Sequence, residues 1–348
     1  MSALPNSHEA LLRNRHCLLG RLAILGISDP GLLTELPQGG LVMSEHAGLY
    51  ERLASNASWT AAFGYGDSSL IREVADTIVI FVPKSRAELS MRLSLALGLV
   101  KSGGRLLLVG EKKEGIAGAV KQLRERLPQA EKIDSARHCQ VWLADGVAPG
   151  AEFQVANWVT WHHVQSHGVR LDVAGLPGIF SDGELDAGTE LLLDTLAEIP
   201  PVAGRILDFA CGAGVIGAWL QGYQSLHSLP VTPVDGMDVQ FQAVACARKT
   251  FDRAGANGTI TASDGLAEVD AKYGAVVTNP PFHSGIRTDT SVAEAFFKEV
   301  RSVLQSGGEL RVVANRFLPY EPLIRRYIGP AKVLAENTRF IVWSAIKR

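Results

Sequence analysis

Short apolar runs rich in valine, isoleucine and leucine alternate along this chain with segments of helical length. Residues 76–84 contain one such run, and residues 87–100 follow with a helical pattern. Near the other end, an apolar run at 273–278 is followed by a helical pattern at 292–304. Strands that alternate with helices are typical of a doubly wound α/β fold built around a parallel sheet.

The same succession of elements occurs twice, so the chain contains an internal repeat. Residues 20–36 align with residues 204–220, and residues 41–54 align roughly with residues 236–249. We therefore predict two tandem Rossmann-like domains, separated where a glycine- and proline-containing stretch at 145–150 interrupts the pattern. The predicted boundaries are residues 1–150 for the first domain, 151–175 for a linker and 176–348 for the second domain.

The composition bounds the class of protein. A chain of 348 residues that is 47% hydrophobic can bury two cores of ordinary domain size. No apolar run approaches the ~20 residues that span a bilayer, and the N-terminal residues lack the pattern of a secretion signal. We therefore expect a cytoplasmic protein with no membrane partner. The four cysteines are scattered without paired spacing, so we expect reduced thiols.

The formal charge of −2 argues against a protein that binds nucleic acid over its whole surface. The charge is uneven, however, because residues 283–348 carry 11 Lys and Arg against 6 Asp and Glu. This asymmetry is compatible with a local surface that faces phosphate, and a solvated basic face explains it equally well. The first half also has basic side chains that can contact phosphate or lie on a solvated helix, namely Lys112, Lys113, Lys121, Arg124, Arg126 and Arg137.

The two halves differ at the turn after their first strand, and this difference locates the predicted chemistry. In the second half the strand runs into Gly212-x-Gly214-x-x-Gly217, a turn in which the backbone can approach a ligand closely. Asp238 ends the next predicted strand and can bind a ribose, with Asp235 as a competitor for this role. The pattern fits either a nicotinamide dehydrogenase or an S-adenosylmethionine (AdoMet) enzyme. The first half lacks the glycine pair, so we expect a degenerate domain without a cofactor site.

Two further features separate these cofactors. Asp208 lies in an otherwise apolar strand just before the turn, where it can organise the loop and face the cationic amino-acid end of a ligand. The fourth strand ends in Asn279-Pro280-Pro281-Phe282. Because parallel strands present their carboxyl ends to the ligand crevice, Asn279 is expected beside the bound molecule.

The residue types of this tetrapeptide suit methyl transfer to a planar amine. The side-chain carbonyl of Asn279 and the main-chain carbonyl of Pro280 can accept both hydrogens of an NH2 group, and proline keeps these acceptors aimed. Phe282 can stack on the ring that bears the amine. Two acceptors favour a more pyramidal nitrogen whose lone pair points to an electrophile, which is a positioning and electrostatic effect. The alternative is an ordinary loop with two prolines.

Other reactive side chains have simpler explanations. We interpret Cys211 as a small packing residue and His283 as a surface or supporting group. His162, His163 and His167 suggest a metal site, but they lie in the predicted linker with no carboxylate or thiol at ligand spacing. We therefore predict no metal.

These motifs resemble the class I AdoMet-dependent methyltransferases, among which N/D-P-P-F/Y/W marks enzymes that methylate exocyclic or amide nitrogens. More narrowly, the tandem plan looks like the ribosomal RNA small subunit methyltransferase C family. The stretches that carry this resemblance are LPGIFSDGELDAGTELLL, DFACGAGVIG, NPPFHSG, SGGELRVVANRFLPY and KIDSARHCQVW. The resemblance covers nearly the whole chain. It implies transfer of a methyl group from AdoMet to the exocyclic N2 amine of a guanosine in 16S ribosomal RNA.

The resemblance also implies which residues bind AdoMet and the target amine. Asp208, Gly212 and Gly214 would bind the methionine end of AdoMet. Asp238 would bind the ribose, and Asp264 would bind the adenine. Asn279 would lie between the cofactor and the target amine, and the catalytic set would be completed by Pro280 and Phe282. The segment before the first strand would cover the cofactor from the other side through Phe180, Asp186, Gly188 and Thr189.

The partner implied by the resemblance is 16S rRNA, within the small ribosomal subunit or an assembly intermediate, and we expect a monomer. Two alternatives stay open. A sister family with the same tandem plan methylates a guanosine of the large subunit, and other enzymes with this tetrapeptide methylate adenine, cytosine or protein glutamine. A non-catalytic RNA-binding or assembly module with a vestigial pocket is a different class, against which the intact glycine turn and tetrapeptide argue.

Overall fold

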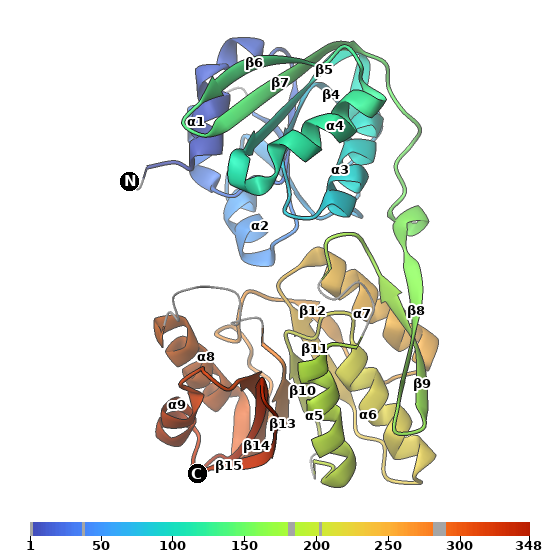
Figure 1. The fold of residues 1–348 in the computed structure, drawn as a ribbon, viewed down its shortest axis with the longest axis vertical. Coiled ribbons are helices and arrows are strands. Elements are labelled where there is room, and N and C mark those ends of the chain that lie inside the picture. Colours follow the sequence, from blue (N-terminus) through green and yellow to red (C-terminus); the bar gives the residue numbers. More distant parts are fainter. Residues whose placement is uncertain (1–2, 37–38, 180–184, 202–203, 281–289) are drawn as a thin grey trace. The chain divides into compact units, whose positions relative to one another are not determined.

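The computed structural model divides into two compact units, Met1–Trp158 and Val159–Arg348 (Figure 1). The residues that it describes are 3–36, 39–179, 185–201, 204–280 and 290–348. Each unit is built around a seven-stranded sheet flanked by helices. The predicted class, two tandem α/β domains, is therefore confirmed.

In the first unit, parallel strands are extended at one side by an antiparallel pair, in the order β3-β2-β1-β4-β5-β7-β6. The strands are β1 (Leu22–Leu25), β2 (Gly40–Ser44), β3 (Trp59–Phe63), β4 (Ala75–Phe81), β5 (Val100–Glu111), β6 (Glu131–Ala136) and β7 (Cys139–Val147). The α-helices of this unit are α1 (Asn6–Arg13), α2 (Ala47–Ala54), α3 (Arg86–Leu99) and α4 (Ile116–Arg126).

The second unit has the equivalent order, β12-β11-β10-β13-β14-β16-β15, again with the last pair antiparallel. These strands are β10 (Ile206–Phe209), β11 (Val234–Asp238), β12 (Ile260–Ala262), β13 (Tyr273–Thr278), β14 (Leu304–Asn315), β15 (Ala331–Glu336) and β16 (Phe340–Ile346). The α-helices are α5 (Ala187–Glu198), α6 (Val215–Leu226), α7 (Phe241–Ala254), α8 (Thr290–Val303) and α9 (Tyr320–Tyr327).

The register of the two sheets matches as well as the strand order. Leu25, the last residue of β1, pairs with Ile80 of β4. Phe209, the last residue of β10, pairs in the same way with Thr278 of β13. The internal repeat seen in the sequence therefore extends to the pairing of individual residues, and positions in one unit can be matched to positions in the other.

The central strand β13 is buried on both faces. Ala275 and Val277 belong to an apolar cluster with Trp219 of α6, whereas Val276 belongs to a second cluster with Phe297 of α8. Successive side chains of a strand point to opposite faces, which explains this alternation. Helices α5, α6 and α7 cover one face of the sheet, and α8 and α9 cover the other (Figure 1). Each buried large apolar side chain contributes about 1.5–3 kcal/mol, so the strand that leads to Asn279 is firmly held.

Residues 151–175 differ from the linker that we expected. They include an antiparallel hairpin of β8 (Thr160–Ser166) and β9 (Val169–Gly175). Val164 of the hairpin belongs to the apolar cluster of the second unit, so the hairpin is part of that unit. The division between the two compact units falls after Trp158, just before the hairpin begins at Thr160.

The histidines of this segment lie on the hairpin rather than in a structureless stretch. His163 Nδ1 lies 2.6 Å from Asp172 Oδ1, and His167 Nε2 lies 3.4 Å from Asp194 Oδ1. Within the described ranges, no group of three or more His, Cys, Asp or Glu side chains is placed to hold a metal ion. All four cysteines of the chain are buried free thiols. No helix in the part of the chain that the structure describes is long and apolar enough to cross a membrane.

Candidate active site

The predicted site residues of the second unit gather at the carboxyl ends of four neighbouring strands. Asp208 lies in β10, Asp238 ends β11, Asp264 follows β12 and Asn279 follows β13. These strands are parallel, so their carboxyl ends meet at one edge of the sheet. We call this edge, with the loops that leave it, the site edge.

The glycine turn joins β10 to α6 in a left-handed conformation that other residues rarely adopt. Gly212 has a φ of 54° and Gly214 a φ of 80°. A Cβ atom at Gly212 would meet nothing within 4 Å, so the main chain there faces open space. Helix α6 begins at Val215, directly after the turn, and the amides of its first residues point back toward the site edge. The turn can therefore bring backbone donors close to a carboxylate of a ligand.

Asp238 holds the glycine turn in place. Its Oδ2 accepts a hydrogen bond from the Gly212 amide at 3.0 Å, and its Oδ1 accepts one from the Gln240 amide at 3.0 Å. Asp235, the competing carboxylate, is buried and forms an ion pair of 2.6 Å with Arg205. The Tyr273 hydroxyl donates to the same carboxylate at 3.0 Å. Asp235 is thus a structural residue, and of the two carboxylates only Asp238 lies at the site edge.

Asp208 is a fully buried carboxylate beneath the glycine turn. Neither of its oxygens makes a hydrogen bond of regular geometry with the described residues. Burial raises the pKa of Asp208 well above its usual range; the nearby Gly217 amide opposes this shift and the charge of Asp238 adds to it. An ionised carboxylate is so costly to bury alone that it takes up a proton or meets a cation. The carboxylate therefore fits the cationic amino end of AdoMet in charge, and it is fully buried in the ligand-free protein.

Asn279 is held by the beginning of helix α5. Its Nδ2 donates to Oδ2 of Asp186 at 3.0 Å and to Oγ1 of Thr189 at 2.9 Å. Asp186 is also the N-cap of α5, because the same Oδ2 accepts from the amides of Gly188 and Thr189 at 3.0 and 3.1 Å. With both Nδ2 hydrogens engaged, the amide plane is fixed and Oδ1 is turned to the side opposite these partners.

The link between Asp186, Thr189 and Asn279 was not predicted from the sequence. Asp186 and Thr189 were predicted to cover the cofactor, and Asn279 to lie between the cofactor and the target amine. A local signal was available, since Asp186-Ala-Gly-Thr189 before an apolar run is a helix-capping pattern. The cap itself can be predicted from that pattern, but its contact with a residue 93 positions later cannot.

The remaining candidates are distributed as follows. Pro280 is buried, and Asp264 is exposed in the loop after β12. Cys211 is buried, and burial raises the pKa of its thiol well above the usual range, so the thiol is not an activated nucleophile. Phe180 and Phe282 lie outside the described residues, as do Pro281 and His283.

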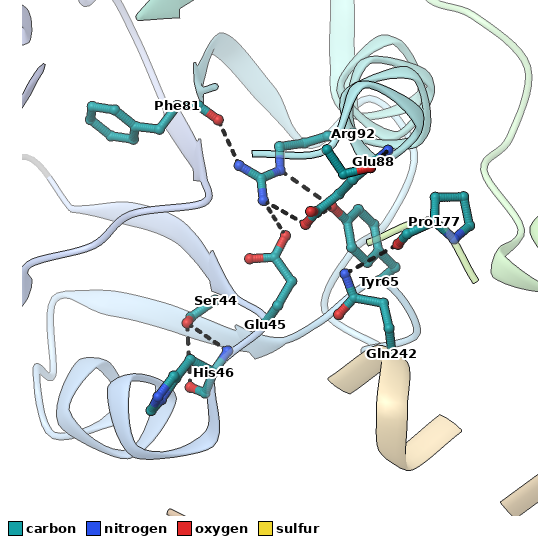
Figure 2. A network of polar contacts seen from close by, with 10 residues as sticks. Ser44, Glu45, His46, Tyr65, Phe81, Glu88, Arg92, Pro177 and Gln242 are labelled. Carbon is teal, nitrogen blue, oxygen red and sulfur yellow. Dashed lines mark hydrogen bonds and ion pairs between the residues drawn. The ribbon is translucent and has the colours of Figure 1, made fainter. Parts of the chain in front are cut away.

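The first unit has a buried charge cluster where the second unit has its site edge. Arg92 of α3 donates from Nη1 to the main-chain oxygen of Phe81 at 2.6 Å and from Nε to the Tyr65 hydroxyl at 3.2 Å. Its Nη2 donates to Oε1 of Glu45 at 2.6 Å and to Oε1 of Glu88 at 3.0 Å. Figure 2 shows the guanidinium group surrounded by these partners, and we call these five residues the Arg92 cluster.

The register of the two sheets matches the Arg92 cluster to the cofactor side of the second unit. Phe81 is the counterpart of Asn279, and Gly26, directly after β1, is the counterpart of the residue that opens the glycine turn. A Cβ atom at Gly26 would lie 1.9 Å from Nη1 of Arg92, so the guanidinium group packs directly on this turn. The side chain of Arg92 thus fills the space beside this turn in the first unit.

Comparison with known proteins identifies the family. The Methyltransferase small domain matches residues 170–344, and the Methyltransferase small domain N-terminal matches residues 8–162. The chain is 39% identical to the ribosomal RNA small subunit methyltransferase C of Hahella chejuensis, with 100% of both chains covered. It is also 39% identical to the protein of that name from Pseudomonas aeruginosa, with 97% of this chain and 98% of that protein covered. The chain belongs to the ribosomal RNA small subunit methyltransferase C family. The resemblance inferred from the motifs is confirmed.

A solved structure agrees with the fold of this family member. The 16S rRNA N2 methyltransferase (RsmC) of T. thermophilus, in complex with AdoMet and guanosine, has a TM-score of 0.84 to this chain. The match covers 99% of this chain and 92% of that one at 23% sequence identity. The two proteins therefore share the two-domain fold over most of their length.

Proposed function

We propose that this chain transfers a methyl group from AdoMet to the exocyclic N2 amine of a guanosine in 16S ribosomal RNA. Membership of the ribosomal RNA small subunit methyltransferase C family supports the reaction class and the RNA substrate. The observation that carries the proposal is the fixed amide of Asn279, whose two Nδ2 hydrogens are engaged by Asp186 and Thr189. This contact supports a role of Asn279 as a hydrogen-bond acceptor for the target amine.

The residues of the site edge fit AdoMet as the cofactor, which supplies an activated methyl group when it is bound. Gly212 and Gly214 would bind the carboxylate of its methionine part through the open backbone of the turn, and Asp208 would balance its amino group. Asp238 would accept hydrogen bonds from the ribose hydroxyls while it still holds the turn. Asp264, exposed in the next loop, would bind the adenine amine.

The residues after β13 would orient the target amine. Oδ1 of Asn279 and the main-chain oxygen of Pro280 would each accept one amine hydrogen, which favours a pyramidal nitrogen with its lone pair directed at the methyl group. The buried strand β13 before Asn279 and the buried ring of Pro280 restrict the main chain, which keeps both acceptors in place. Phe282 is proposed to stack on the guanine, and Phe180 to cover the cofactor.

The proposed substrate is 16S rRNA in the small subunit or in an assembly intermediate, and the proposed location is the cytoplasm, where ribosomes are made. We propose a monomer in which the first unit supports the second or contacts RNA. Methylation of the large-subunit RNA is the alternative within the same chemistry. A non-catalytic RNA-binding module is the alternative from another class, and the glycine turn together with the tetrapeptide at 279–282 argues against it.

The decisive experiment is mass mapping of methylated nucleotides in ribosomal RNA from a strain that lacks the gene. We expect one N2-methylguanosine of 16S rRNA to disappear, to return with the parent gene and to stay absent with Asn279→Ala. Loss of a mark in 23S rRNA would instead favour the large-subunit reaction. A complete set of marks in the deletion strain would contradict the proposed function.

A further inference from the structure

The turn that leaves β14 presents an aromatic ring to solvent. Phe317 is 69% exposed, more than any other large apolar side chain in the described part of the chain. Its neighbours Leu318 and Tyr320 are buried in the core beneath α8 and α9. The Leu318 amide donates to the Asn315 main-chain oxygen at 3.0 Å, which closes the turn. The ring is therefore held outward by an anchored turn and not by a loose loop.

This turn leaves the sheet at the site edge. Strand β14 runs parallel to β13, and Thr278 pairs with Val312. β14 continues to Asn315 and then enters the turn, so Phe317 follows the strand next to the one that carries Asn279. The exposed ring belongs to the same edge of the sheet as the proposed acceptor of the target amine.

Two guanidinium groups accompany the exposed ring. The Arg316 amide donates to the Arg339 main-chain oxygen at 3.0 Å, which joins the turn to the connection between β15 and β16. Arg316 also donates from Nη1 to the Asn337 main-chain oxygen at 3.0 Å. One carboxylate, Glu336, lies 3.3 Å from Arg316 Nη2 and is itself half-exposed, so the local charge stays positive.

The side chain of Arg339 is linked to the site edge through the ring of Phe340. The Arg339 guanidinium lies 5.3 Å from the ring centroid of Phe340. Ring carbons of Phe340 lie 3.3 and 3.4 Å from the position that a Cβ atom would take on Gly188. The Gly188 amide is bound by Asp186, which also binds Asn279. A continuous set of contacts therefore runs from Arg339 to the proposed catalytic amide.

We propose that Phe317, Arg316 and Arg339, which we call the RNA rim, bind the RNA strand next to the target guanosine. Phe317 stacks on a neighbouring base, and the two arginines contact phosphates. This inference rests on the proposed function, because a base that enters the site must leave its stack and bring its backbone across this edge. Single-stranded RNA is recognised by such pairs of stacking ring and basic group.

The chemistry of the rim favours RNA over a protein partner. Protein interfaces need a contiguous core of buried apolar contacts. Here Leu318 and Tyr320, which follow Phe317, are buried, so the exposed ring is not part of a contiguous apolar surface on this turn. An exposed ring on the same turn as Arg316, which the main chain joins to Arg339, suits a base and its neighbouring phosphates.

The test is single-turnover methylation of 16S rRNA, in the form that the parent protein methylates, over a range of RNA concentrations. We expect Phe317→Ala to raise the RNA concentration for half-maximal rate about 5- to 150-fold, the range for loss of one stacked base. Phe317→Tyr should stay close to the parent, because it keeps the ring. AdoMet affinity, measured by calorimetry, should be unchanged in both. Replacing Arg316 and Arg339 by Gln should weaken the salt dependence of RNA binding. The slope of log K against log salt concentration should fall by about one for each lost phosphate contact.

Matched controls come from the opposite edge of the same sheet, where α6 and α7 end. Leu226→Ala removes an apolar side chain that is 55% exposed. Arg253→Gln removes a guanidinium that is 50% exposed and paired with a carboxylate, as Arg316 is. Neither control should alter the RNA dependence. If Phe317→Ala and Leu226→Ala both methylate RNA and need the same RNA concentration for half-maximal rate, the proposed RNA rim is wrong and the proposed function stands. A folded parent that binds no AdoMet and methylates no RNA overturns both.

Discussion

The side-chain amide of Asn279 and the carboxylate of Asp186 meet at 3.0 Å across 93 residues of sequence. The same carboxylate oxygen caps helix α5, because it accepts hydrogen bonds from two main-chain amides of the first turn. One oxygen atom therefore sets both the start of a helix and the orientation of the proposed catalytic amide. The position of the amine acceptor depends on helix α5 as well as on the strand that carries Asn279.

Asn279→Ala should slow methyl transfer about 10²- to 10³-fold while AdoMet affinity stays nearly unchanged. An interaction made chiefly in the transition state lowers the rate at saturating cofactor and RNA, and groups that stabilise developing charge have this magnitude. Single-turnover rates together with calorimetry would check it. An Ala variant as fast as the parent would show that the tetrapeptide is only a rigid loop.

Comparison of Asp186→Asn with Asp186→Ala should show whether Asp186 positions the amide of Asn279. Asn keeps an oxygen that can cap α5 and accept from Asn279, so most of the rate should remain. Ala removes the cap and the amide partner, so the rate should fall, with about 0.5–2 kcal/mol of stability lost from the cap alone. Equal rates for the two variants, each corrected for folded fraction, would contradict a positioning role.

Asn279→Asp should acquire a pH dependence that the parent lacks. The new carboxylate would lie against Asp186, and two carboxylates at that distance hold one proton between them at acidic pH. The shared proton restores the hydrogen bond, so the rate should rise as the pH falls. The same substitution combined with Asp186→Asn has one carboxylate and should lose this dependence. A flat pH profile for the single variant would argue against the contact.

Asp208 should make the ligand-free protein less stable as the pH rises. Burial raises its pKa in the folded state, so the folded protein holds the proton more tightly than the unfolded chain. Stability therefore falls from about pH 3.9, the unfolded value, up to the raised folded pKa. Asp208→Asn should remove this slope, stabilise the ligand-free protein at neutral pH and weaken AdoMet binding. Urea unfolding at several pH values would measure it, and an unchanged slope in the variant would refute it.

Asp238→Ala should weaken AdoMet binding by roughly 1–3 kcal/mol, since it removes a charged hydrogen-bonding partner and loosens the glycine turn. Asp235→Ala is the contrasting variant, because it breaks a buried network and should lower the free energy of unfolding. Calorimetry with AdoMet and with NADH would test both roles. Tight NADH binding without AdoMet binding would favour the dehydrogenase interpretation.

The full-length protein should bind one AdoMet per chain. The Arg92 cluster fills the matching position of the first unit, so binding depends on the second unit alone. Titration of the parent and of Asp238→Ala would check this. A second saturable site that survives Asp238→Ala would show that the first unit also binds the cofactor.

The sequence was sufficient to predict the strand that ends at Asn279 and the turn at Gly212. Both follow from local rules, because an apolar run interrupted by proline or glycine marks the end of a parallel strand. The hairpin at 160–175 was missed, since β8 is mostly exposed and Val164 is its one buried residue. The contact between Glu45 and Arg92 was also beyond local rules, because it joins residues 47 positions apart.

The Arg92 cluster makes the interior of the first unit difficult to convert into a ligand pocket. Replacing Arg92 alone would strand Glu45 and Glu88 together in the interior, a change that typically costs about 3–5 kcal/mol. Opening a ligand pocket there would need the arginine and both carboxylates to change, and each single step would lower stability first. The interior ion cluster thus acts as a stability barrier against stepwise change of the first unit toward ligand binding.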